Sequence, residues 1–359
     1  MQSKDKINPS KLEKIATFNP NSVGLLNGNL YGLPFTYEES DIIVIPVPWE
    51  VTVSYQAGTA KAPQAILDAS SQLDLYDFDV PDFWKKGIYM LPISEYWQQK
   101  NETLRQQAKR YIDFLENGGN VEDNAKMKAI LEAINKVNFE LKEFVKQNAQ
   151  KILNDNKLAI VLGGEHSVPL GLLEALAEKH ESFGMLQIDA HADLHEAFEG
   201  FKLSHASIMH NALKIEQLSK IVSVGIRDIC HAEIEVIKQS ENRIKAFFDD
   251  EIKEQVQIKQ IETWHSLCEK IVEQLPQKLY ISFDIDGLDP KLCPNTGTPV
   301  SGGLSFHEAT YLIKQVVKSG REIIGFDLCE TGFSKNTDWD ANVGARVLYK
   351  LAALSSFKK

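Results

Sequence analysis

Short apolar segments alternate along the chain with longer segments in which apolar residues recur every three or four positions. The short segments are rich in β-branched residues and have no polar face, which is typical of parallel strands covered on both sides. They lie at residues 42–47, 158–163, 184–189, 221–226, 279–284 and 323–328. The longer segments have the period of amphipathic helices and lie at residues 169–180, 261–275, 305–320 and 341–355. This alternation predicts a three-layer α/β/α fold around a central parallel sheet.

Two regions fall outside this alternation. Residues 100–156 are charged and favour helix without any strand pattern, so they predict two helices that separate near residues 118–120. We interpret this segment as a solvent-exposed helical insertion without chemistry of its own. Residues 1–37 resemble an arm without a core, which leaves residues 38–359 as one large domain.

Composition narrows the class of protein and of partner. The net charge of −11 argues against nucleic acid and anionic membrane surfaces as partners. The four cysteines form no CxxC pair, so they indicate reduced thiols rather than a zinc knuckle or a redox pair. The N-terminus lacks an apolar signal-peptide core, and no segment approaches the roughly 20 apolar residues of a membrane span. We therefore expect a soluble cytoplasmic protein.

Ionisable side chains gather where four of the predicted strands end. The carboxyl ends of parallel strands meet at one edge of a sheet, and ligands of open parallel sheets bind there. These side chains are therefore expected to share one crevice. They are Glu165 and His166 after the strand at 158–163, Asp189, His191 and Asp193 after 184–189, Asp284, Asp286 and Asp289 after 279–284, and Glu330 after 323–328.

Several carboxylates in one crevice repel each other unless cations lie among them. Lys202 and Arg227 are the nearest basic residues in sequence, which makes divalent metal ions the better partners. Oxygen ligands with some imidazole suit Mn²⁺ and, less specifically, Ni²⁺, Fe²⁺ or Co²⁺. Two metals about 3.5–4 Å apart are a known device for hydrolysis. The predicted ligands, whose four carboxylates balance two divalent cations, are His166, Asp189, His191, Asp193, Asp284 and Asp286.

Each of these motifs alone has a simpler explanation. An isolated Asp-x-Asp is usually a solvated turn, and a histidine after two glycines is usually a hydrogen-bonded structural residue. The alternation from Asp189 to Asp193 is more specific, because alternate side chains at a strand end point the same way. Three such motifs, each after an apolar strand, favour the metal site.

The motifs GGEHS (163–167), DAHADLH (189–195) and SFDIDGLDP (282–290) resemble the signatures of the ureohydrolases, which include arginases, agmatinases and formimidoylglutamases. The resemblance spans about residues 40–355 in family order, and residues 46–66 are similar to the agmatinase type. It implies a single catalytic α/β domain with about eight parallel strands. It also implies a homotrimer or homohexamer.

The same resemblance implies two Mn²⁺ ions per subunit and a set of roles. One metal would take His166, Asp189, Asp193 and Asp284, and the other would take His191, Asp189, Asp284 and Asp286. The segment KLSHASIMH (202–210) is similar to the family segment that carries a proton-transfer histidine, here His205. Glu330 matches the glutamate that pairs with the substrate guanidinium.

The substrate is the open question. Arginases usually have asparagine at the position of His195, and formimidoylglutamases often have arginine there, so His195 weakens the case for a substrate α-carboxylate. The acidic neighbours Glu196 and Glu199 fit an amine tail, which favours hydrolysis of agmatine to putrescine and urea. An arginase, guanidinobutyrase, guanidine hydrolase or formimidoylglutamase is the alternative, and a metal-containing binding protein without turnover is a distant one. For a small guanidine compound, an aromatic set would close the pocket, namely Trp49, Tyr55, Phe333 and Trp339.

Overall fold

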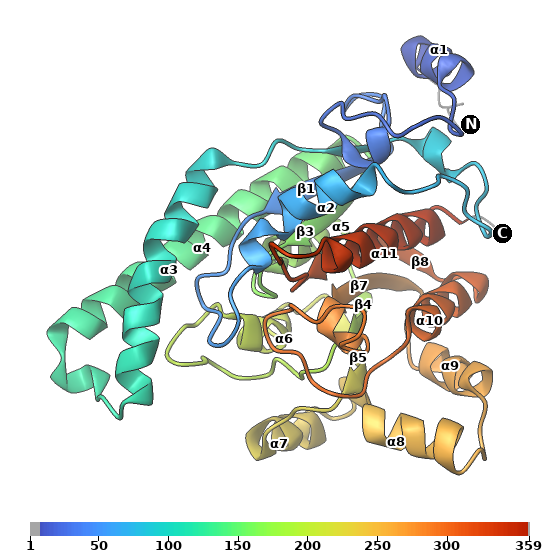
Figure 1. The fold of residues 1–359 in the computed structure, drawn as a ribbon. Helices are drawn as coiled ribbons and strands as arrows, with labels where there is room; N and C mark the ends of the chain where they lie inside the picture. Colours follow the sequence, from blue (N-terminus) through green and yellow to red (C-terminus); the bar gives the residue numbers. More distant parts are fainter. Residues whose placement is uncertain (1–7, 358–359) are drawn as a thin grey trace.

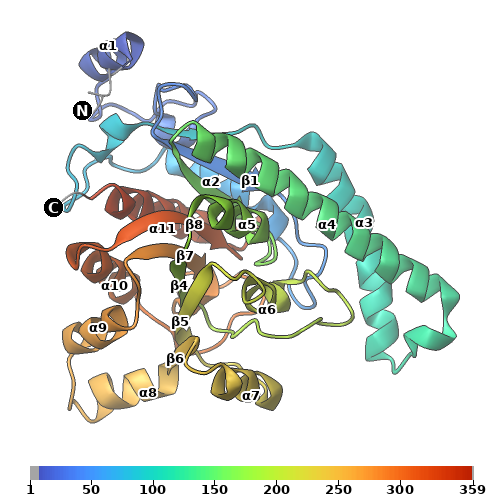
Figure 2. The ribbon, with the colours of Figure 1, turned by 180° about the vertical axis from the view of Figure 1, so that it is seen from behind.

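The computed structural model describes residues 8–357 and contains one sheet of eight parallel strands, with helices on both faces (Figures 1 and 2). The strand order is β2-β1-β3-β8-β7-β4-β5-β6. The predicted fold class is therefore confirmed, and all six predicted strands are present. The strands are β1 (Ile42–Val47), β2 (Ile88–Met90), β3 (Leu158–Gly163), β4 (Phe183–Ile188), β5 (Leu218–Ile226), β6 (Ile244–Phe248), β7 (Lys278–Asp284) and β8 (Glu322–Cys329).

The two strands that the sequence pattern did not predict, β2 and β6, form the two edges of the sheet. β2 has three residues and pairs only with β1, and most of β6 is partly exposed. Edge strands need no continuous apolar run because one side faces solvent. Their weak pattern follows from their position.

The strands are apolar throughout because alternate residues enter two separate cores. In β1, Val44 joins the core under α2, α9, α10 and α11, whereas Ile43 and Ile45 join the core under α3, α4, α5 and α6. Figures 1 and 2 show these helices on opposite sides of the sheet. The helices are α1 (Pro9–Thr17), α2 (Ala62–Ser70), α3 (Glu95–Glu116), α4 (Ala125–Asn154), α5 (Leu170–Lys179), α6 (Ile208–Ala212), α7 (His231–Gln239), α8 (Asp249–Lys253), α9 (Trp264–Glu273), α10 (Phe306–Lys318) and α11 (Trp339–Ser355).

The two regions outside the alternation of strands and helices are both attached to the sheet domain. Helix α1 is held by ion pairs from Lys11 to Asp41 (2.7 Å) and from Lys14 to Glu39 (2.6 Å). The start of the proposed N-terminal arm, residues 1–7, lies outside the described residues. Helices α3 and α4 pack against each other and extend to one side of the molecule (Figure 1). Among residues 8–357, no helix has the length and apolarity to cross a membrane.

Candidate metal centre

The four strands that end in acids or imidazoles are neighbours in the middle of the sheet, in the order β3-β8-β7-β4. His166 follows β3, Glu330 follows β8, Asp284 ends β7 and Asp189 follows β4. All four side chains are buried. The topology thus brings together residues that are up to 164 positions apart, as between His166 and Glu330.

The first group of side chains surrounds one ring nitrogen of His166. Its Nδ1 lies 3.1 Å from Asp189 Oδ2, 3.0 Å from Asp193 Oδ2 and 3.2 Å from Asp284 Oδ2. Ligands at about 2.1 Å from an ion and at right angles to each other are about 3.0 Å apart. The spacing therefore suits four ligands around one divalent cation.

The second group shares Asp189 with the first. His191 Nδ1 lies 3.1 Å from Asp286 Oδ2 and 3.7 Å from Asp189 Oδ1. Asp189 thus presents one oxygen to His166 and the other to His191. The ligand atoms of Asp189, His191 and Asp286 lie within 4.8 Å of one another, as do those of His166, Asp189 and Asp284. A carboxylate between two imidazoles in this way is suited to bridge two ions.

The buried carboxylates of the two groups would be stabilised by cations. Burial alone would lower the pKa of His166, but the three surrounding carboxylates raise it well above its ordinary value. Burial and Asp189 raise the pKa of Asp193 to about 7. Two buried atoms, His166 Nδ1 and Asp286 Oδ2, have no hydrogen-bond partner among residues 8–357. Arg227 donates instead to the backbone carbonyls of Gly225, Asp286, Leu288 and Val300. A pair of divalent cations would satisfy the orphaned atoms and neutralise the carboxylates.

Polar residues inside the strands orient these side chains. His166 Nε2 lies 2.8 Å from Ser282 Oγ, and Ser282 donates to Asp327 Oδ2 at 3.0 Å. Because the hydroxyl proton points to Asp327, Ser282 accepts the Nε2 proton, and the lone pair of Nδ1 faces the carboxylates. Gln187 likewise donates to Asp189 Oδ2 at 3.0 Å. Sequence analysis missed all three residues, although a polar residue inside an apolar strand is a readable signal.

Glu330 lies next to the first group with one oxygen unsatisfied. Its Oε1 accepts from the backbone N–H of His166 at 2.8 Å, and its Oε2 is buried without a partner. A Cβ added to Gly297 would lie 3.0 Å from Oε2, a tight contact, so glycine at this position leaves space in front of the oxygen. Burial, with Glu165 and Asp286 nearby, raises the pKa of Glu330 well above its ordinary value. The carboxylate is positioned for a cationic hydrogen-bond donor.

His205 is connected to the same motif through Thr52. The backbone N–H of Thr52 donates to Glu165 Oε2 at 2.8 Å, and Thr52 Oγ1 lies 3.2 Å from His205 Nδ1. Burial, with the neighbouring His191 and His166, lowers the pKa of His205 to about 3. The imidazole is therefore neutral at neutral pH. His205 and Glu330 are both anchored to the dipeptide Glu165–His166.

His195 lies at the edge of the site and not among the two groups. It is half-buried, its Nε2 is 3.6 Å from Glu233 Oε2, and its ring is 5.4 Å from that of Phe198. The ring of Phe198 is in turn 5.7 Å from that of His205. His195 therefore borders the proton-transfer candidate and faces a buried carboxylate.

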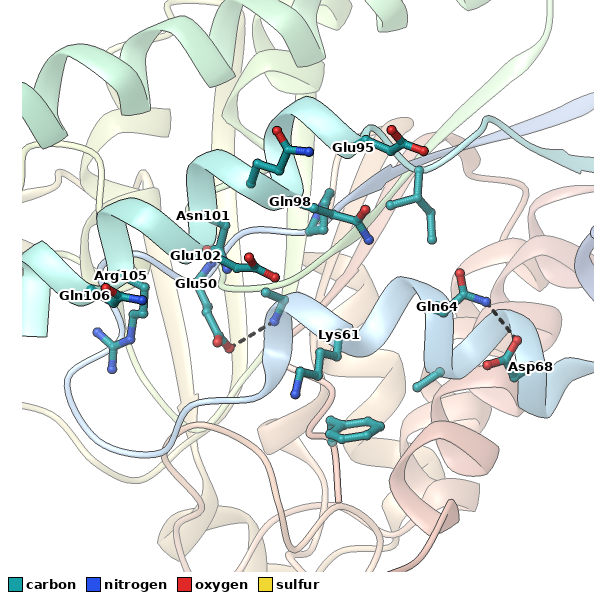
Figure 3. A pocket seen from close by; sticks show the side chains of 16 residues that line it. Glu50, Lys61, Gln64, Asp68, Glu95, Gln98, Asn101, Glu102, Arg105 and Gln106 are labelled. Atoms are coloured by element: carbon teal, nitrogen blue, oxygen red, sulfur yellow. Dashed lines mark hydrogen bonds between the residues drawn. The ribbon is translucent and has the colours of Figure 1, made fainter. Parts of the chain in front are cut away.

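The expectation of an aromatic pocket is not supported by the positions of its members. Trp49 is fully buried and packs against Trp97, whereas Tyr55 is 72% exposed. Phe333 lines a groove of about 810 Å³ between α2 and α3 (Figure 3), and none of the six predicted ligands lines that groove. These side chains do not form one enclosure.

The groove shows how α3 contacts the segment after β1. Asn101 and Arg105 of α3 lie beside Glu50 in Figure 3. The Asn101 Oδ1 accepts from the backbone N–H of Glu50 at 2.7 Å, and Arg105 donates to Val51 O at 3.4 Å. Thr52 follows directly, so α3 supports the residue that contacts His205.

Comparison with known proteins identifies the family. The model of the arginase family matches residues 40–353. An N(1)-aminopropylagmatine ureohydrolase of Synechocystis sp. is 28% identical over 320 residues, which cover 88% of this chain and 89% of that protein. An agmatinase of Bacillus anthracis is 26% identical over 305 residues, with 82% and 84% covered. The solved agmatine ureohydrolase of Thermoplasma volcanium has the same fold, with a TM-score of 0.67 at 23% identity over 96% of this chain and 97% of that one. The chain thus belongs to the arginase family of ureohydrolases, as its motifs predicted.

Proposed function

We propose that this ureohydrolase is of the agmatinase type and hydrolyses agmatine to putrescine and urea at a centre of two Mn²⁺ ions. The observation that carries the proposal is the sharing of Asp189 between two ligand groups, one around His166 and one around His191. His166, Asp189, Asp193 and Asp284 would hold one ion. His191, Asp189, Asp284 and Asp286 would hold the other. Ni²⁺ fits the same nitrogen and oxygen ligands.

The metals would supply a nucleophilic water at neutral pH and a positive field for developing charge. The protein residues have separate tasks. The free Oε2 of Glu330 would accept charge-assisted hydrogen bonds from the guanidinium and orient its central carbon. His205, neutral at pH 7, would take up a proton and deliver it to the amine nitrogen as the carbon–nitrogen bond breaks. The transferred proton comes from the attacking water, so one water and the guanidinium together account for urea and the protonated amine.

The amine tail is supported by the residues around His195. The buried Glu233 lies 3.6 Å from His195 Nε2, and its negative charge favours a cationic tail over a carboxylate. Two of the relatives are named for agmatine and for N(1)-aminopropylagmatine. Each of these compounds has a terminal amine at the end away from its guanidine. In this proposal His195 contributes to the wall that the tail contacts.

A homotrimer or homohexamer in the cytoplasm belongs to the same proposal. Several large apolar side chains are exposed, with Val23 at 90%, Leu26 at 88% and Phe78 at 90%. Contacts between subunits would cover side chains of this kind. All four cysteines are free, which suits a reducing compartment. Sedimentation of the purified protein tests the assembly, and cell fractionation tests the location.

A substrate panel tests the activity. The protein is loaded with Mn²⁺ or Ni²⁺ and assayed for urea release from agmatine, N(1)-aminopropylagmatine, arginine, 4-guanidinobutyrate and guanidine, with formamide detection for formiminoglutamate. We expect the highest kcat/KM for a substrate with an amine tail. Preference for arginine or guanidinobutyrate would refute the role of His195 and Glu233 in substrate choice, and lack of turnover with every compound would refute the proposed hydrolase activity.

A further inference from the structure

A third group of metal-ligating side chains lies outside the two groups that share Asp189. The ligand atoms of His195, Cys230 and Glu233 lie within 4.8 Å of one another. None of these residues belongs to the predicted ligand set of the binuclear centre. The group combines imidazole, thiol and carboxylate, whereas the centre itself contains only imidazole and carboxylate.

The backbone holds the three residues in place. Glu233 Oε1 accepts from the backbone N–H of Leu194 at 3.0 Å, and Oε2 accepts from that of Cys230, also at 3.0 Å. Helix α7 begins directly after Cys230, and the backbone N–H of His195 donates to Ala206 O at 3.1 Å. Each oxygen of Glu233 keeps a further lone pair. The three side chains are therefore held in place, and the oxygens of Glu233 can still bind a metal ion.

The distance between His195 Nε2 and Glu233 Oε2 fits two ligands of one metal ion. At 3.6 Å it is too long for a hydrogen bond. It is close to the separation of about 3.3–3.5 Å between nitrogen and oxygen ligands of one tetrahedral zinc ion. Cys230 is partly exposed, so an ion and its remaining water ligand have access from solvent.

We propose that His195, Cys230 and Glu233 form a zinc site at the rim of the catalytic centre. A thiolate ligand selects Zn²⁺ over Mn²⁺, because soft sulfur ligands suit zinc and hard oxygen ligands suit manganese. Binding would release the thiol proton of Cys230 to solvent. The site would thus hold a different metal from the one in the binuclear centre.

Zinc at this site would weaken the binding of the substrate, and this consequence rests on the proposed function. The ion would occupy His195 and neutralise Glu233, the two groups that we assign to the amine tail. It would also add positive charge where a cationic substrate enters. Zinc would therefore raise KM and leave kcat nearly unchanged.

Metal stoichiometry tests the site independently of activity. Protein loaded with two Mn²⁺ is titrated with Zn²⁺, and both metals are counted after desalting. The wild type should retain two Mn²⁺ and gain one Zn²⁺ per chain. Cys230→Ala should bind this zinc at least about tenfold more weakly, and Cys268→Ala, a buried thiol on α9, should bind it as the wild type does. After Co²⁺ is bound in place of zinc, a thiolate-to-cobalt absorption band should appear in the wild type and be absent from Cys230→Ala.

The outcomes separate this site from the proposed activity. Zinc that only displaces manganese, or binds equally well to Cys230→Ala, would overturn the rim site. If the site binds zinc but no guanidino compound is hydrolysed, the proposed function fails and the rim site stands. With active enzyme, zinc should raise KM for agmatine in the wild type and in Cys268→Ala, and should not raise it in Cys230→Ala. An equal rise in all three proteins would contradict inhibition through this site.

Discussion

The carboxylate centre and the loop that carries His205 are held in place by different means. Asp189 and Asp284 follow or end central strands and are held by sheet hydrogen bonds, and the backbone N–H of His166, just after β3, donates to Glu330. The loop before His205 is held by side chains of the α3–α4 hairpin. Asn135 donates to Gly200 O at 3.1 Å, Asn138 donates to Leu203 O at 2.9 Å, and the hydroxyl of Tyr111 donates to Glu199 O at 2.8 Å.

This difference separates two requirements of the reaction. The proposed metal ligands depend on the sheet, which forms the core of the protein. His205, the proposed proton-transfer residue, depends on a helical hairpin that reaches its loop through single hydrogen bonds from distant residues. Residues 100–156, which we expected to have no chemistry of their own, thus hold both loops in place through hydrogen bonds. These two loops meet where Thr52 contacts His205. Changes in the two regions should have different effects on metal content and on turnover.

The largest effect is expected from Asp189→Asn. The substitution removes the charge shared by both ligand groups, so metal and activity should be lost together, with activity falling by about 10²-fold or more. Metal content by mass spectrometry and urea release measure the two effects. Asp289→Asn is the control, because Asp289 lies in the same family of motifs but pairs with exposed Lys291. An Asp189→Asn protein that kept two metals per chain would show that Asp189 is not a bridge.

The next effect is expected from His205→Asn. Loss of the proton-transfer group should lower kcat by about 10²–10⁴-fold, while both metals remain bound. His210→Asn provides the control, since His210 lies on the following helix α6 and has no assigned role. Loss of metal from His205→Asn would place His205 in the metal centre instead.

A smaller effect is expected from Asn138→Ala on α4. The change leaves the carbonyl of Leu203 without its donor, which costs about 1–3 kcal/mol of local stability. We expect kcat to fall by about tenfold through displacement of His205, with metal content unchanged. Asn148→Ala on the same helix is matched to it, because Asn148 bonds only to the carbonyl of Phe144 one turn earlier. Equal kcat in the two variants would refute the supporting role of the hairpin.

The smallest effect lies outside both regions, at helix α1. Burial alone would raise the pKa of Glu39, but Lys14, Ser10 and the N–H of Thr36 lower it to about 2. A lowered carboxyl pKa stabilises the fold above the ordinary value of 4.5. This contribution should therefore disappear as the pH falls from about 4.5 to about 2. Lys14→Ala should lower the free energy of unfolding at pH 7 by about 1–3 kcal/mol, and kcat at pH 7 should not change. Thermal unfolding at several pH values measures the loss.

The sequence predicted the strands in which burial on both faces determines the type of residue. Six strands of the sheet are largely buried on both faces, so most of their residues are apolar. The edges β2 and β6 are partly solvated, and their pattern is correspondingly weak. Strand ends also revealed the clustered acids, because their parallel arrangement follows from the strand pattern.

The contacts between distant loops could not be predicted from the sequence. Thr52, Asn138 and Tyr111 act through one hydrogen bond each, and no periodicity marks such a residue. Ser282 and Asp327 were visible as polar interruptions of apolar strands, yet their pairing with His166 depends on the strand order. Cys230 and Glu233 become neighbours of His195 only through the packing of α7.

The anchoring of Glu330 and Thr52 to consecutive residues has a thermodynamic consequence. His166 is proposed to bind a metal through its ring while its backbone N–H holds Glu330, and the adjacent Glu165 holds Thr52. Any ion that fixes His166 therefore also restricts the groups that contact the guanidinium. Coupling of this kind is reciprocal, so agmatine should strengthen the equilibrium binding of metal, measured in competition with a chelator, by the same factor by which metal strengthens the binding of agmatine.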